Sequence, residues 1–87
     1  MVQTVKIRMT RDVEAPKGIG ERIKQARIAD GRSVQVLATL AGISSAYWYQ
    51  IEQEKRSYVS EEHFRGIENV LGVDFGVSFD QGGSNNG

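Results

Sequence analysis

The sequence predicts a small, mainly α-helical domain of four helices, with a short two-stranded β ribbon formed by its N- and C-terminal segments. Apolar residues recur at helical spacing in four segments, and glycines stand where three of these segments end. Two further segments, one near each end of the chain, instead alternate apolar and polar residues, which is typical of strands. A length of 87 residues suits a single domain with one modest core.

The N-terminal residues 1–18 are expected to form a strand and a linker. From Thr4 to Met9 every second residue is apolar, which predicts a strand. Pro16, the only proline, keeps the preceding residue out of helical geometry, so a linker should follow. The first helix is then predicted from Ile19 to Ala29, ahead of an Asp-Gly pair.

The segment SVQVLATLAGISSAYWYQIEQ, residues 33–53, predicts two short helices joined by a tight turn. The first, about 34–41, has an apolar face at i, i+3, i+4 and i+7 and a serine, Ser33, at its N-cap position. Gly42 suits the left-handed position that ends it, and Ser44 can cap the second helix, about 45–53. Trp48 and Ile51 should face the core, so the pair forms a helix-turn-helix.

A fourth helix, Glu61 to Leu71, should begin at a capping Ser60. His63 lies in its first turn and is interpreted as a solvent-exposed bystander rather than a pH sensor. Alternation over VDFGVSFD then predicts a strand at 73–80, pairing with residues 4–9, whose free edge would be a homodimer seam. The tail QGGSNNG, 81–87, lacks apolar residues and is expected to be disordered.

Composition excludes several classes of function. The chain has no cysteine and one histidine, which predicts no metal site and no cofactor. It has no membrane-length apolar run and no signal-peptide pattern, so a cytoplasmic protein is expected. Eleven basic and eleven acidic residues cancel, yet residues 1–32 have a balance of +4 and the remainder −4. This asymmetry indicates either a basic face with an acidic back or simply a mixed solvated surface.

From Gly20 to Val73 the chain resembles the lambda-repressor and Cro-like (XRE-type, Cro/C1-type) family of helix-turn-helix DNA-binding domains. The motifs GERIKQAR, SVQVLATLAGIS, YQIEQEKR and IENVLGV occur in that family's order and spacing. The resemblance makes residues 19–72 the helix-turn-helix domain, with the helix at about 45–53 as its recognition helix. Glu54 departs from the family pattern, which commonly has Gly or Asn there to end that helix.

The resemblance implies that the start of the recognition helix enters the major groove. The residues expected to reach base edges are Ser45, Ala46, Tyr47 and Gln50. Gln50 could bond bidentately to adenine N6 and N7. The residues expected to contact phosphates are Ser33, Gln35, Tyr49, Lys55 and Arg56. The family often has a glutamine where this chain has Val34, so Gln35 is expected to substitute for it.

Two further sets of basic residues have alternative interpretations. Arg27 is either a free surface cation or, as the resemblance implies, the ion-pair partner of Glu52. Lys6, Arg8 and Arg11 either follow the DNA as an N-terminal arm or form the outer face of the first strand.

Catalysis is not expected. The carboxylate pair Glu61 and Glu62 lies in the first turn of a helix, and Ser33 and Ser44 are explained as helix caps. The predicted function is sequence-specific binding of double-stranded DNA by a homodimeric bacterial or phage-type transcription regulator. The alternative is a protein-interaction module, antitoxin-like or an adaptor, that uses Tyr47, Tyr49 and the acidic fourth helix to bind an unidentified protein partner.

Overall fold

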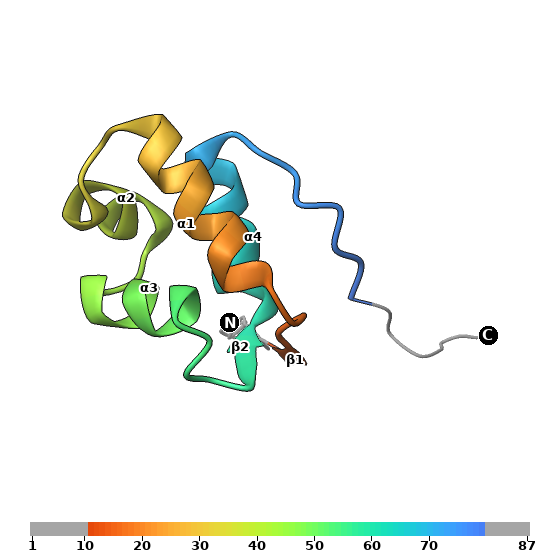
Figure 1. Cartoon of the computed structure of the whole chain (residues 1–87). Helices are drawn as coiled ribbons and strands as arrows, with labels where there is room; N and C mark the ends of the chain where they lie inside the picture. Colours follow the sequence, from red (N-terminus) through yellow and green to blue (C-terminus); the bar gives the residue numbers. More distant parts are fainter. Residues whose placement is uncertain (1–10, 80–87) are drawn as a thin grey trace, which may run out of the picture.

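The structure is a computed structural model that describes residues 11–79 of the chain. Its elements, in chain order, are β1 (Asp12–Glu14), α1 (Ile19–Asp30), α2 (Val34–Ala41), α3 (Ser45–Glu52), β2 (Tyr58–Ser60) and α4 (Glu61–Leu71). In Figure 1, α1 and α4 lie together, α2 and α3 pack at one side of them, and the small sheet lies beneath. The fold is therefore mainly helical, with four helices as the sequence predicts.

Each helix contributes its predicted apolar face to one core. The largest side chains in it are those of Trp48 and Phe64, which are almost fully buried. The remaining buried hydrophobic residues are Val13, Ile19, Ile23, Val34, Leu37, Ala38, Ile51, Val59, Ile67 and Phe75. Because the core draws on α1, α2, α3 and α4 together, it fixes the orientation of α3 relative to the rest of the domain.

The turn between α2 and α3 is closed by the residues that the sequence pattern singles out. Gly42 adopts φ 80°, in the left-handed region, and its N–H donates to backbone carbonyls in the last turn of α2. Ile43 N donates to Ala38 O at 2.9 Å. The Ser44 hydroxyl then accepts from Tyr47 N at 3.0 Å and caps α3. The two helices therefore form a helix-turn-helix.

The predicted β ribbon is corrected by the structure. The sheet of the described residues pairs β1 with β2, antiparallel, with Val13 opposite Val59. Both valines point into the core, whereas their neighbours Asp12, Glu14 and Tyr58 are exposed. Sequence analysis placed residues 12–14 in a linker and predicted no element at residues 58–60, because three-residue strands with one inward residue each give too little alternation to detect. The predicted strand 4–9 lies outside the described residues.

The strand expected at 73–80 is not formed over residues 73–79, which pair with no strand of the described residues 11–79. The apolar residues of this segment nevertheless face inward as the alternation predicts, since Phe75 is buried and Val77 and Phe79 pack against the core. Side chains, instead of a second strand, satisfy the backbone: Phe75 N donates to Glu68 Oε2 and Arg65 Nη2 donates to Val77 O. Gly76, at φ 73°, interrupts the extended geometry.

The end of α3 lies directly against the start of α1. A Cβ on Gly20 would stand 2.0 Å from Glu52 O, so only glycine allows this approach. Glu54 occupies the left-handed position after α3, at φ 54°, and its carboxylate accepts from Gly20 N at 2.8 Å. Glu54, which departs from the family pattern, thus ends α3 in the left-handed conformation and also accepts from an N–H in the first turn of α1.

At the start of α4 the expected cap bond is missing. Ser60 is the N-cap residue, but its side chain accepts no capping hydrogen bond. Its hydroxyl is buried without a hydrogen-bond partner in the described part of the chain. The position of the cap is thus as predicted, whereas its expected chemistry is wrong.

Candidate nucleic-acid interface

The first two turns of α3 present a mixed polar and apolar face away from the core. Trp48 and Ile51 are buried, which turns the intervening positions outward. Ala46 is exposed, whereas Ser45, Tyr47 and Gln50 are partly buried. The four residues predicted to reach base edges therefore come from one accessible region of a helix whose other side is fixed in the core.

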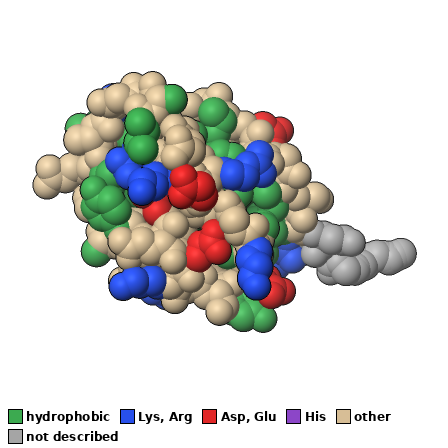
Figure 2. Space-filling view, in the orientation of Figure 1, with side chains coloured by type: hydrophobic (Ala, Val, Ile, Leu, Met, Phe, Trp, Pro, Cys, Tyr) green, Lys and Arg blue, Asp and Glu red, His purple; other side chains and the backbone are tan. Residues whose placement is uncertain are grey.

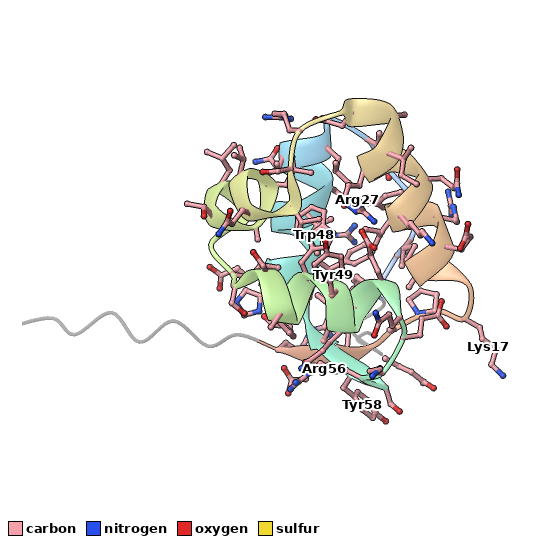
Figure 3. The ribbon with its side chains drawn as sticks, turned by 60° about the vertical axis from the view of Figure 1, so that its left-hand side comes forward. Lys17, Arg27, Trp48, Tyr49, Arg56 and Tyr58 are labelled. Carbon is pink, nitrogen blue, oxygen red and sulfur yellow. The ribbon has the colours of Figure 1, made fainter. Side chains whose placement is uncertain are left out.

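A buried ion pair holds α3 against α1. Arg27 Nε donates to Glu52 Oε2 at 2.5 Å and Arg27 Nη2 donates to Glu52 Oε1 at 3.0 Å, so the ion pair that the resemblance implies is present and is bidentate. Trp48 Nε1 also donates to Glu52 Oε2, at 2.7 Å, and the Glu52 side chain is only 4% exposed. The bond to Glu52 raises the pKa of Arg27 above its ordinary value, although burial opposes this rise. In Figure 3, Arg27 and Trp48 lie near one another between α3 and the other helices.

Gln50 and Tyr47 are joined to the loop that follows α3. Arg56 Nη1 donates to Gln50 Oε1 at 3.1 Å, and the guanidinium carbon lies 5.1 Å from the centre of the Tyr47 ring. Tyr47 in turn packs edge-on against His63 of α4, with ring centres 5.2 Å apart. His63 is therefore not the solvent-exposed bystander expected from the sequence, because it supports a predicted base-contacting residue.

The predicted phosphate-contacting residues lie at the start of α2, on α3 and in the loop after α3. Ser33 caps α2 by accepting from Val36 N, which leaves its O–H free to donate. Val34 is buried and cannot reach a phosphate, whereas Gln35 beside it is exposed. Gln35 is thus available for the role that the family gives to its glutamine.

Among the other predicted phosphate contacts, Lys55 and Arg56 are exposed loop residues. Tyr49 is 42% exposed and its ring lies beside the Arg27 guanidinium, with the guanidinium carbon 5.8 Å from the ring centre. Its hydroxyl can donate to a phosphate oxygen. All three therefore have access to a ligand that approaches α3.

The predicted N-terminal arm is only partly accounted for. Arg11 Nη2 donates to Glu61 Oε1 at 2.7 Å and to Phe79 O at 3.0 Å, so this guanidinium joins the start of β1 to α4 and to the C-terminal segment. These bonds occupy it within the fold. Lys6 and Arg8, the other two arm residues, lie outside the described residues.

Charge is mixed on the face of the molecule in Figure 2, where basic and acidic side chains lie next to one another. Several arginines are neutralised locally. Arg32, for example, bonds both carboxylate oxygens of Asp30, at 2.7 and 2.8 Å, and this pairing lowers the pKa of Asp30 to about 2. The basic excess of residues 1–32 is reduced by two other pairs, in which Arg11 and Arg27 bond the carboxylates of Glu61 and Glu52.

Two exposed side chains near the interface were missed by sequence analysis. Tyr58, 58% exposed, projects from β2 close to Arg56, and Lys17 projects from the connection between β1 and α1 (Figure 3). Neither follows from periodicity, because Lys17 lies in the predicted linker and no element was predicted around Tyr58. The β1–β2 pairing and the contact of α1 with the end of α3 bring these segments to the side of α3.

The fold and this interface define the class as a helix-turn-helix domain. A family model described as a helix-turn-helix domain matches residues 19–77, and the chain belongs to that family. The match agrees with the resemblance seen in the sequence and extends through most of the extended segment after α4. No curated protein and no solved structure matched the chain.

Two further features were considered for the described residues: a membrane-spanning helix and a metal-binding cluster. None of the described helices is long and apolar enough to cross a membrane. Residues 11–79 also contain no group of three or more side chains arranged to hold a metal ion.

Proposed function

We propose that the domain binds double-stranded DNA sequence-specifically, with α3 as the recognition helix, and acts as a small XRE-type transcription regulator of bacterial or phage origin, in the cytoplasm. The observation that supports this most strongly is the fixed presentation of α3. The Arg27–Glu52 pair and the buried Trp48 hold one side of the helix, while Gln50 and its neighbours face outward. A preorganised helix loses little entropy when it enters a groove.

The contacts divide into two kinds. Base edges would be read by Ser45, Ala46, Tyr47 and Gln50. Phosphates would be bound by Ser33, Gln35, Tyr49, Lys55 and Arg56, together with the unpaired N–H groups at the starts of α2 and α3. The domain would act as a homodimer, which would place two copies of α3 about 34 Å apart on half-sites one helical turn apart. Lys6 and Arg8 would add phosphate contacts as an arm.

Selection from a randomised duplex pool, with sequencing of the bound fraction at about 50 and about 200 mM salt, tests this function. The expected result is an enriched motif with two-fold symmetry that weakens at the higher salt. A pool that shows no enrichment at either concentration would contradict sequence-specific binding. An enriched motif without symmetry would contradict the homodimer alone.

A second candidate is a protein-interaction module, favoured by apolar side chains on the outer side of α2. Val36 is 47% exposed and Leu40 is 60% exposed, and they line a shallow depression of about 440 Å³ with Gln35 and Thr39. Such exposure suits a protein partner. Salt dependence separates the two functions, because neutralising about four phosphates per subunit gives a log-log slope of about −3.6 and an apolar seam gives a slope near zero.

A further inference from the structure

Arg56 is positioned by two contacts with α3, which lie on the side of that helix away from Trp48 (Figure 3). Its Nη1 donates to Gln50 Oε1 at 3.1 Å, and its guanidinium group packs over the Tyr47 ring. Tyr47 is itself supported by α4, since its hydroxyl lies 3.4 Å from His63 Nδ1. A continuous set of contacts thus runs from α4 to the side-chain amide of Gln50.

This arrangement determines which end of the Gln50 amide faces outward. A guanidinium group has five N–H donors and no acceptor, so only the carbonyl oxygen of an amide can bond to it. With Oε1 directed to Arg56, Nε2 and its two hydrogens point away from the guanidinium. Gln50 therefore offers hydrogen-bond donors to an approaching ligand.

We propose that Arg56 is a positioning residue that sets the base preference of Gln50, so that Gln50 reads a guanine. This inference rests on the proposed function. Guanine presents two acceptors in the major groove, N7 and O6, which match the two hydrogens on Nε2. Adenine presents one acceptor and one donor, N7 and the N6 amino group, and its bidentate recognition needs an available Oε1. Arg56 uses one of the two lone pairs of Oε1 and places its positive charge beside the other, so a second donor there, such as the adenine N6 amino group, is disfavoured.

The same guanidinium group links base reading to the DNA backbone. One of its five donors is used on Gln50, and the others are available to a phosphate oxygen. Arg56 is exposed, so a phosphate can reach it without displacing either contact. A bound phosphate would then strengthen the orientation of Gln50 instead of competing with it.

Selection from a randomised duplex pool with four proteins tests the proposal: wild type, Gln50→Ala, Arg56→Met and, as the matched loss of a charge in the same loop, Lys55→Met. Gln50→Ala identifies the base-pair column that Gln50 reads. The wild type is expected to enrich guanine in that column. Arg56→Met should reduce the preference for guanine over adenine there by about 5- to 150-fold, the range of one good bidentate contact. Lys55→Met should weaken binding to all sequences and leave that column unchanged.

Three results would overturn the proposal. Adenine enriched by the wild type in the Gln50 column would show that Oε1 is free to accept. An unchanged column in Arg56→Met, with weaker binding to every sequence, would make Arg56 a phosphate contact only. A wild-type pool without any motif would overturn the proposed function as well, which distinguishes that failure from the first two. Thermal unfolding of Arg56→Met checks that the fold is intact, and no change is expected because the side chain is exposed.

Discussion

Replacing Gly20 by alanine should destabilise the domain although alanine is the better helix former. The helix-propensity gain is about 1 kcal/mol. Against it, the added Cβ would meet Glu52 O at 2.0 Å and Glu52 C at 2.7 Å, and both are backbone atoms that cannot rotate away. Forcing this contact apart costs about 1 to 3 kcal/mol by overpacking. Separating α1 from α3 also breaks the bond from Gly20 N to Glu54, which adds about 1.5 to 3 kcal/mol for a charged acceptor.

The net loss should be about 1.5 to 5 kcal/mol, which lowers the Tm of a domain of this size by about 6 to 40 °C. Urea and thermal unfolding followed by Trp48 fluorescence measure it, because Trp48 is the only tryptophan and is fully buried. Gly66→Ala is the matched comparison in α4, where the new Cβ would lie 3.1 Å from Ala41 O and requires a shift of only a few tenths of an ångström. Gly20→Ala as stable as the wild type would refute the close approach of α1 and α3.

Three further predictions concern the other contacts that hold the helices. Glu52→Ala should cost about 1 to 3 kcal/mol because it leaves Trp48 Nε1 and the partly buried Arg27 without their acceptor, and a double-mutant cycle with Arg27→Ala should give a non-zero coupling energy. The Asp30 carboxyl should titrate with a pKa of about 2 when followed by NMR. Its contribution to the free energy of unfolding is therefore present above pH 4 and disappears as the pH falls toward 2. A titration midpoint near pH 4 would mean that its pairing with the neighbouring arginine does not persist in solution. Ser44→Ala should cost about 1 kcal/mol and Ser60→Ala almost nothing, because only the first hydroxyl caps a helix; equal losses in chemical denaturation would contradict this difference.

Local sequence signals were sufficient for the helices. Apolar spacing indicated the faces that contain Leu37, Trp48 and Ile67, all of which are buried. Gly42 and Ser44 marked the turn of the helix-turn-helix because left-handed backbone geometry and N-cap hydrogen bonds are properties of one or two residues.

Long-range pairing was not predictable in the same way. Alternation around Phe75 shows that the segment is extended with one face buried, but it does not identify the group that satisfies its backbone. That group is Glu68 of α4, a side chain, where a second strand was expected. The β1–β2 pairing was missed because Val13 and Val59 are single inward residues in short strands.

Some contacts within the candidate interface could also not be predicted from the sequence and are seen only in the three-dimensional structure. Arg56 and Gln50 were each predicted as DNA contacts, but their hydrogen bond depends on the path of the loop after α3. The left-handed conformation of Glu54 directs that loop, and no rule of spacing predicts it for a glutamate. The contact of His63 with Tyr47 likewise depends on how α4 packs beside α3.

NMR mapping of isotopically labelled protein titrated with double-stranded DNA at about 50 mM salt tests the central claim most directly. The predicted result is that the largest amide shifts fall at the starts of α2 and α3 and in the loop containing Lys55 and Arg56, whereas the side of α4 that bonds the C-terminal segment through Glu68 stays unchanged. Shifts absent at α3, or confined to α4 or to the surface around Leu40, would contradict the assignment of α3 as a DNA recognition helix.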